Sequence, residues 1–202
     1  MIPGNKLTSD RLTTQTRRSG FSYDTMKLNL SITFIAVLLA VAVDRVLSTS
    51  PPPTSPWIGK QAPELAKGDW VNSSPRSLRD LRGKVVLLEF WAFECSNCRN
   101  TLPHLKEWYG KYGHSGFEII GIHTPEFDRE KKLDILKREI AHLGITYPVL
   151  TDNDYTTWNR YDQQYWPVLY LLDKRGVIRY VHIGEGSYDE TDRCIASLLA
   201  EK

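Results

Sequence analysis

Residues 85–98 read VVLLEFWAFECSNC, an apolar run that ends in two cysteines separated by two residues. The near-continuous apolar stretch Val85–Phe93 is typical of a strand that is covered on both faces of a sheet. Ser96–Tyr112 has the pattern of a helix, so Cys95 stands where a buried strand gives way to a helix. The first turn of a helix leaves backbone N–H groups unpaired, and these groups and the helix dipole stabilise an anion. This junction therefore predicts a reactive site.

The pair Cys95 and Cys98 has the spacing needed for thiol–disulfide exchange. A thiol at a helix N-terminus has a lowered pKa, and the thiolate is the form that attacks a disulfide. Residues three apart on a helix face the same way, so Cys98 can reach Cys95 and resolve a mixed disulfide. A purely structural disulfide that closes so short a loop would constrain the unfolded chain very little. We predict that Cys95 attacks and Cys98 resolves.

The third cysteine, Cys194, stands alone in the expected last helix. A zinc site needs about four ligands, usually in two separated pairs, and the sequence offers no second pair. A lone cysteine beside apolar residues is typical of a small buried side chain, so we assign Cys194 no chemistry. The sequence predicts no metal site and no bound cofactor.

The remaining part of the domain alternates between strands and helices. Further strands are expected at 117–123, 147–150, 168–172 and 177–183, and further helices at 129–143, 155–161 and 190–200. The tetrapeptide DKRG at 173–176 is a hairpin signal between the last two strands. Alternating strands and helices, followed by a hairpin and a last helix, predict an α/β fold with a mixed central sheet flanked by helices.

The segment EFWAFECSNC at 89–98 resembles the active site of the thioredoxin superfamily, and Pro103 matches the proline that kinks the first helix of thioredoxins. Four later stretches resemble the TlpA/ResA/DipZ-like branch of thiol–disulfide oxidoreductases, namely GIHTPEF at 121–127, DNDY at 152–155, YWP at 165–167 and GEG at 184–186. The resemblance covers nearly all of residues 58–202. It implies a thioredoxin fold (a redoxin domain) with an extra strand–helix insertion around residues 125–150.

The resemblance also implies roles for residues around the cysteines. Pro167 matches a proline that is cis in the family and packs against the disulfide, and the backbone of Trp166 would pair with a substrate chain. Glu89 matches the buried acid that exchanges a proton with the second cysteine. Its place within an apolar strand leads us to expect a raised pKa, and a structural acid facing a polar gap or a lysine is the alternative.

Three further residues are candidates to line the substrate cleft, namely Trp91, Phe93 and His123. If strand 117–123 runs parallel to strand 85–93, its carboxyl end opens on the same side as Cys95. A loop held by its own hydrogen bonds is an equal alternative for the segment that starts at His123. The two aromatic residues either shield the disulfide from water or pack in the core.

The N-terminal part differs from this domain in composition. Residues 1–27 are polar, residues 28–43 (LNLSITFIAVLLAVAV) are the one long apolar stretch, and residues 44–57 contain a Pro/Ser/Thr linker. The apolar stretch is slightly short for a membrane span of about 20 residues and long for a signal-peptide core of about 7–15. The basic residues before it favour export of the domain. We expect a membrane-anchored or secreted domain on the extracytoplasmic (periplasmic) side, with anchor and cleaved signal as alternatives.

Charge excludes one class of partner. The chain has a formal net charge of +2, and residues 1–57 hold six basic and three acidic groups, so the predicted domain is close to neutral. A domain without a basic surface is not expected to bind nucleic acid. The expected partners are protein dithiols or disulfides and a redox partner, with the membrane reached through the N-terminal segment.

Two other functions can use a reactive cysteine pair of this kind. Thiol peroxidases of the peroxiredoxin type carry a threonine three residues before the reactive cysteine, and this chain has Ala92 there. A copper-binding thiol module could use the cysteine pair with a histidine such as His123. The direction of exchange is not set by the sequence, because redox poise depends on the residues around the cysteines. The expected tether and the resemblance favour a reductant.

Overall fold

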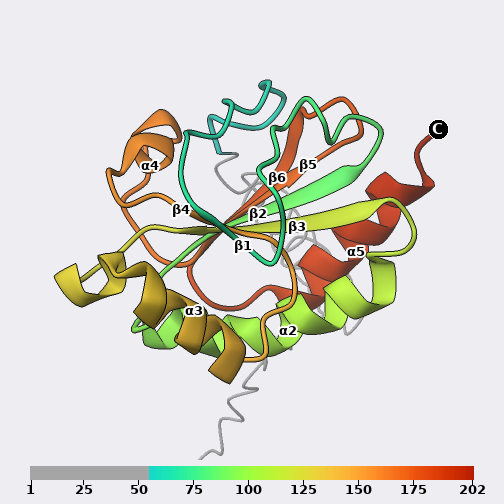
Figure 1. Ribbon diagram of the computed structural model, residues 1–202. Coiled ribbons are helices and arrows are strands. Elements are labelled where there is room, and N and C mark those ends of the chain that lie inside the picture. The colour runs from blue at the N-terminus through green and yellow to red at the C-terminus, as the bar shows by residue number, and fades with distance from the viewer. Residues whose placement is uncertain (1–54) are drawn as a thin grey trace, which may run out of the picture. The chain divides into compact units, whose positions relative to one another are not determined.

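Strand β2, Val85–Trp91, lies inside a six-stranded sheet and leads the chain to the cysteines (Figure 1). In the computed structural model, the described part of the chain is residues 55–202. All seven residues of β2 are buried, as expected for a strand with neighbours on both sides and cover on both faces. The predicted anchor or signal at 28–43, the polar segment 1–27 and most of the linker lie outside the described residues. Within 55–202, no helix is long and apolar enough to cross a membrane.

The sheet order is β1-β4-β3-β2-β5-β6. Strands β2, β3 and β4 run parallel to one another. At the two ends of the sheet, β1 pairs antiparallel with β4, β5 with β2, and β6 with β5. The other strands are β1 (Trp70–Val71), β3 (Phe117–His123), β4 (Val149–Thr151), β5 (Val168–Leu172) and β6 (Ile178–Ile183). The carboxyl ends of β2, β3 and β4 therefore meet the amino end of β5 at one edge, which we call the cysteine edge.

Helices cover the two faces unequally. The described helices are α2 (Ser96–Tyr112), the 3-10 helix η1 (Asp128–Lys131), α3 (Leu133–His142), α4 (Thr156–Arg160) and α5 (Tyr188–Ala200). Figure 1 shows α2, α3 and α5 on one face of the sheet and α4 on the other. The second face is also covered by the segment before β2, through Ala62, Leu65, Leu78 and Leu81. The mixed α/β architecture predicted from the sequence is confirmed.

Side chains along β2 alternate between the two cores. The three-helix side receives Val85, Leu87 and Trp91, and the opposite side receives Val86, Leu88 and Phe90. Glu89 follows the odd-numbered set and so faces the side of α2. The period of the strand thus directs one carboxyl group towards the helix that holds the cysteines.

The observed elements differ from the predicted ones at two points in the insertion. The helix expected at 129–143 is divided, because Lys132 has extended backbone angles (φ −80°, ψ 112°) between η1 and α3. The strand expected from 147 begins at Val149, because Pro148 has no N–H to give to a ladder. The two-residue strand β1 was not predicted.

Candidate active site

Cys95 and Cys98 differ in their access to solvent. Cys95 is the N-cap residue of α2 and is half-buried, whereas Cys98 lies in the first turn and is fully buried. The Cys95 Sγ atom accepts a hydrogen bond from the backbone N–H of Cys98 at 3.3 Å. Both thiols are free. A substrate sulfur approaching from solvent therefore meets Cys95 first.

The environment also separates the two thiols in acidity. The hydrogen bond from the Cys98 thiol lowers the pKa of Cys95 to about 7, although partial burial acts in the opposite direction. Hydrogen bonds from backbone N–H groups lower this pKa further, by a smaller amount. Burial, together with that same hydrogen bond, raises the pKa of Cys98 far above the usual range for a thiol. At neutral pH the thiolate therefore forms at Cys95, which is the accessible cysteine.

Glu89 is fully buried on β2, paired with Gly121 on β3 and Leu169 on β5. Its Oε2 atom accepts a hydrogen bond from the Tyr147 hydroxyl at 3.1 Å, and its Oε1 atom is buried with no hydrogen-bond partner among the described residues. Burial raises the pKa of Glu89 to about 8. The charge of Glu89 adds to the raised pKa of Cys98, after burial and the hydrogen bond to Cys95, so the two groups interact electrostatically.

Trp166 and Pro167 lie at the cysteine edge, immediately before β5, and the peptide bond between them is cis. The Trp166 indole N–H donates to the carbonyl oxygen of Thr124 at 3.1 Å, and the ring lies against Trp158 with centroids 4.2 Å apart. The Pro167 carbonyl accepts a hydrogen bond from the backbone N–H of Gly184 at 2.8 Å. The segment is thus held from both sides.

The structure places the other three predicted site residues below the surface. Trp91 and His123 are 0% exposed and Phe93 is 3% exposed. The His123 ring stacks on Phe93 (5.4 Å between centroids, 15° between planes) and meets Trp91 edge-on. Burial lowers the pKa of His123 to about 3, so the ring is neutral. These three side chains pack beneath the cysteine edge, and their burial argues against direct contact with a substrate.

The sequence profile of the AhpC/TSA family matches residues 58–181. The chain belongs to the AhpC/TSA family. The match covers more than half of the chain and includes both cysteines and the segment up to β6.

Relatives place this AhpC/TSA domain more narrowly. It is 45% identical to Protein DipZ of Mycobacterium tuberculosis over 143 residues, which are 68% of this chain and 20% of DipZ, so the chain spans about one fifth of that relative. It is 27% identical to thiol-disulfide oxidoreductase ResA of Geobacillus kaustophilus, over 82% of this chain and 93% of ResA. A crystal structure of a thioredoxin-like superfamily protein superposes with a TM-score of 0.66 at 30% identity, covering 70% of this chain and 97% of that one. The predicted thioredoxin fold and the TlpA/ResA/DipZ-like branch are confirmed.

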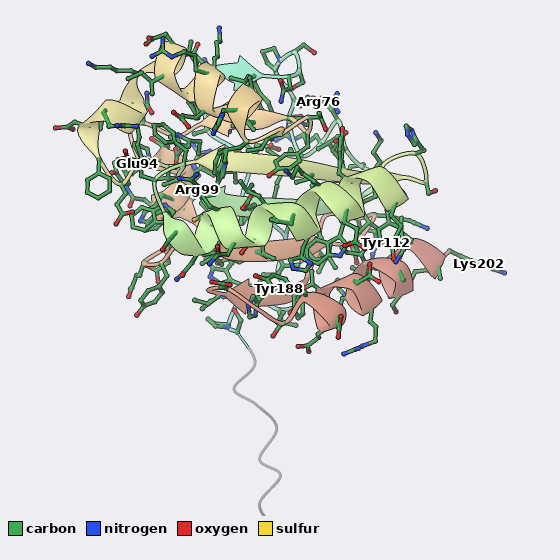
Figure 2. All side chains as sticks on the ribbon, turned by 90° about the horizontal axis from the view of Figure 1, so that it is seen from below. Arg76, Glu94, Arg99, Tyr112, Tyr188 and Lys202 are labelled. Carbon is green, nitrogen blue, oxygen red and sulfur yellow. The ribbon has the colours of Figure 1, made fainter. Side chains whose placement is uncertain are left out.

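One residue of this AhpC/TSA domain was missed because the charged run at 128–139 has the composition of a solvated helix face. Glu130 departs from that pattern, since it is 0% exposed. Its carboxylate accepts three backbone hydrogen bonds, from Glu94 at 2.9 Å, Glu126 at 2.6 Å and Phe127 at 2.9 Å. Glu94 immediately precedes Cys95, and Figure 2 shows it at the end of the domain where α2 begins, near Arg99. The insertion is therefore fastened to the cysteine loop.

Replacing Glu130 with glutamine is expected to destabilise the fold by ~1–3 kcal/mol, since the amide has one acceptor and turns its NH₂ group towards a buried N–H. Urea unfolding measures the change. Glu107→Gln, an equal charge change at an exposed position of α2, is the control and should leave the midpoint unchanged. Equal stability of the two variants would contradict a structural role for the Glu130 carboxylate.

Tyr147 was also missed. It was expected only as the first residue of a strand at 147–150, and the structure places its hydroxyl on Glu89. No pattern in the sequence distinguishes a tyrosine that packs from a tyrosine that donates to a buried carboxylate 58 positions away.

Proposed function

We propose that this domain performs thiol–disulfide exchange on exported proteins through Cys95 and Cys98. The observation that supports it best is the asymmetry of the two thiols: one is accessible with a pKa of about 7, and the other is buried with a strongly raised pKa. Attack requires a thiolate that can be reached, and resolution requires a second thiol that waits behind it. The relative ResA, named as a thiol-disulfide oxidoreductase, supports the same activity.

The reducing reaction proceeds in two displacements. The Cys95 thiolate attacks one sulfur of a substrate disulfide, the substrate S–S bond breaks, and the other substrate sulfur leaves and takes up a proton. Cys98 then gives its proton to the ionised Glu89 carboxylate and attacks the Cys95 sulfur. The S–S bond between Cys95 and the substrate breaks, and the second substrate sulfur leaves as a thiolate that takes up a proton. The substrate has gained two electrons, and the domain holds a Cys95–Cys98 disulfide that a redox partner must reduce.

Substrate binding is proposed at Trp166 and Pro167. The indole of Trp166 is already engaged by Thr124 and Trp158, which leaves its backbone as the group to pair with a substrate chain. Tyr165, the residue before it, is 58% exposed, so the segment reaches the surface just before Trp166. Trp91, Phe93 and His123 are proposed to support the site from beneath.

The reducing direction, the extracytoplasmic location and attachment to a membrane through residues 28–43 belong to the same proposal. They are supported by the apolar stretch and the basic residues that precede it, and by the resemblance to the TlpA/ResA/DipZ-like branch. The full chain fused to a reporter enzyme that is active only in the periplasm tests the location directly. A product found in the cytoplasm would contradict it.

A peroxidase role is less well supported. The position three residues before Cys95 is Ala92, which is fully buried and has no hydroxyl to give to a peroxide. Its carbonyl oxygen accepts the backbone N–H of Cys95 at 3.3 Å. Peroxide turnover far above that of a simple dithiol would reverse this ranking.

The proposed function is tested by trapping the mixed disulfide between the domain and its substrate. Cys98→Ala should accumulate a mixed disulfide between Cys95 and its substrate, because the resolving thiol is absent. Non-reducing electrophoresis with mass spectrometry measures the adduct, and Cys194→Ala is the control that should turn over normally. If Cys98→Ala forms no adduct with any protein disulfide, protein substrates are ruled out.

A further inference from the structure

Glu89 depends on one side chain for its hydrogen bonding within the described part of the chain. That side chain is Tyr147, whose hydroxyl donates to Oε2 at 3.1 Å. Both residues are 0% exposed. Tyr147 belongs to neither the cysteine helix nor the strand of Glu89, because it lies two residues before β4, at the end of the insertion. A polar pair is thus built between two distant segments, in the same core that holds the resolving cysteine.

We propose that Tyr147 is a positioning residue for Glu89, whose hydroxyl binds Oε2 and keeps Oε1 free to take the proton of Cys98. This rests on the proposed exchange function. The carboxyl group of glutamate has two torsions along its stem, and inside an apolar core only a directed hydrogen bond selects one orientation. The free Oε1 atom is the one buried acceptor of Glu89 without a partner in residues 55–202.

The space for the Tyr147 ring is provided by Gly121. This glycine pairs with Glu89 in the register of β2 and β3, and its N–H donates to the carbonyl of Pro148 at 2.9 Å. A Cβ atom at position 121 would lie 2.9 Å from the Trp91 Nε1 atom and 3.2 Å from the Tyr147 ring. The absence of a side chain at Gly121 therefore lets the tyrosine reach across β3 to β2.

The Tyr109 ring also packs against Tyr147, edge-on at 5.9 Å between centroids. Close packing by Gly121 and Tyr109 leaves Tyr147 little freedom to turn its hydroxyl away from Glu89.

The electrostatics of the pair agree with this role. Burial raises the pKa of Glu89 to about 8, and the hydrogen bond from Tyr147 acts in the opposite direction because a donor favours the charged carboxylate. Burial and the nearby Glu89 raise the pKa of Tyr147 well above its ordinary value, so the phenol stays protonated and can only donate. Three other titratable groups interact with this pair, namely Cys95 at the N-cap of α2 and Cys98 and Tyr109 on α2. Burial raises the pKa of Tyr109, so its phenol stays protonated. The strand partners of Glu89, Gly121 on β3 and Leu169 on β5, carry no charge.

Tyr147→Phe tests the proposal, since it keeps the ring and removes the hydroxyl. The readout is the decay of a mixed disulfide between Cys95 and a disulfide-containing peptide, followed in single turnover as a function of pH. We expect the midpoint of the resolution rate to move up by at least about one pH unit and the rate at pH 7 to fall about tenfold, because the charged carboxylate loses its donor. Alkylation of Cys95 should be unchanged.

Tyr161→Phe is the matched control. Tyr161 is also 0% exposed and its hydroxyl also makes one hydrogen bond, to the carbonyl of Pro63 at 2.8 Å, but it belongs to the opposite core. The Tyr161→Phe variant should lose a comparable amount of stability, and its resolution rate should keep the wild-type pH midpoint. A wild-type midpoint in folded Tyr147→Phe would overturn the proposal.

Two further results separate this inference from the proposed function. If the wild-type domain exchanges no disulfide at all, the function fails; if it does and only the Tyr147→Phe midpoint is unchanged, the inference alone fails. Should Tyr147→Phe not fold, 3-fluorotyrosine placed at position 147 keeps the ring and strengthens the donor. It is expected to move the midpoint to lower pH, and an unchanged midpoint would again overturn the proposal.

Discussion

Cys95→Ser is expected to abolish disulfide exchange, because a serine hydroxyl has no accessible anion at neutral pH and cannot form the mixed disulfide. Insulin reduction or the reduction of a fluorescent peptide disulfide measures the loss. Cys194→Ser should retain the wild-type rate, since Cys194 is partly buried on α5, where burial raises the pKa of its thiol. Residual turnover in Cys95→Ser above that of a Cys95→Ser/Cys98→Ser double variant would show that Cys98 attacks substrate directly.

The same cysteine has a pH signature that is independent of any substrate. With a pKa of about 7, the rate at which Cys95 reacts with iodoacetamide should rise about tenfold for each pH unit up to neutrality and reach a plateau near pH 8. An ordinary thiol would continue to gain rate to beyond pH 9. A midpoint in that ordinary range would contradict the proposed activation at the helix N-terminus.

Glu89→Gln is expected to slow the resolution step by about 10²-fold or more, within the range for loss of a positioned proton acceptor. Glutamine has the same shape and can still accept from Tyr147, but it cannot ionise. The decay of the Cys95 mixed disulfide measures the effect, and its dependence on pH around 8 should disappear with the carboxylate. Alkylation of Cys95 should stay within a few-fold of wild type. Equal decay in both proteins would remove Glu89 from the mechanism.

Stability provides a second check on Glu89. Burial raises the pKa of this carboxyl from 4.5 to about 8, so between these values the folded state binds more protons than the unfolded state. Stability contributed by the protonated group is therefore present below about pH 4.5 and is lost as the pH rises towards 8. Glu89→Gln lacks this loss, so its melting temperature should gain on wild type as the pH is raised through this window. A parallel pH dependence in both proteins would contradict the raised pKa.

Several features of the fold followed from local patterns. The apolar runs at 85–93, 117–123 and 168–172 predicted three central strands, and α2 has the bounds expected for it. These predictions succeed because a strand covered on both faces is apolar at most positions and because backbone sterics act over a few residues. The period of two along β2 also places Glu89 on the face of α2, before any contact is known.

The active site also has some features that local sequence determines and others that tertiary packing determines. The order strand, CxxC, helix is contained within residues 85–112, so the sequence alone determined where an activated thiol stands and which cysteine lies nearer the helix terminus. Only the tertiary structure decided which groups surround that pair. Tyr147 reaches Glu89 across 58 positions and Glu130 reaches Glu94 across 36, and the burial of Glu130 inside a charged run and of His123 at a strand end follows no local period. Secondary structure depends on neighbours along the chain, whereas a buried carboxylate finds its donors only when the packing of separate elements brings them within hydrogen-bond distance.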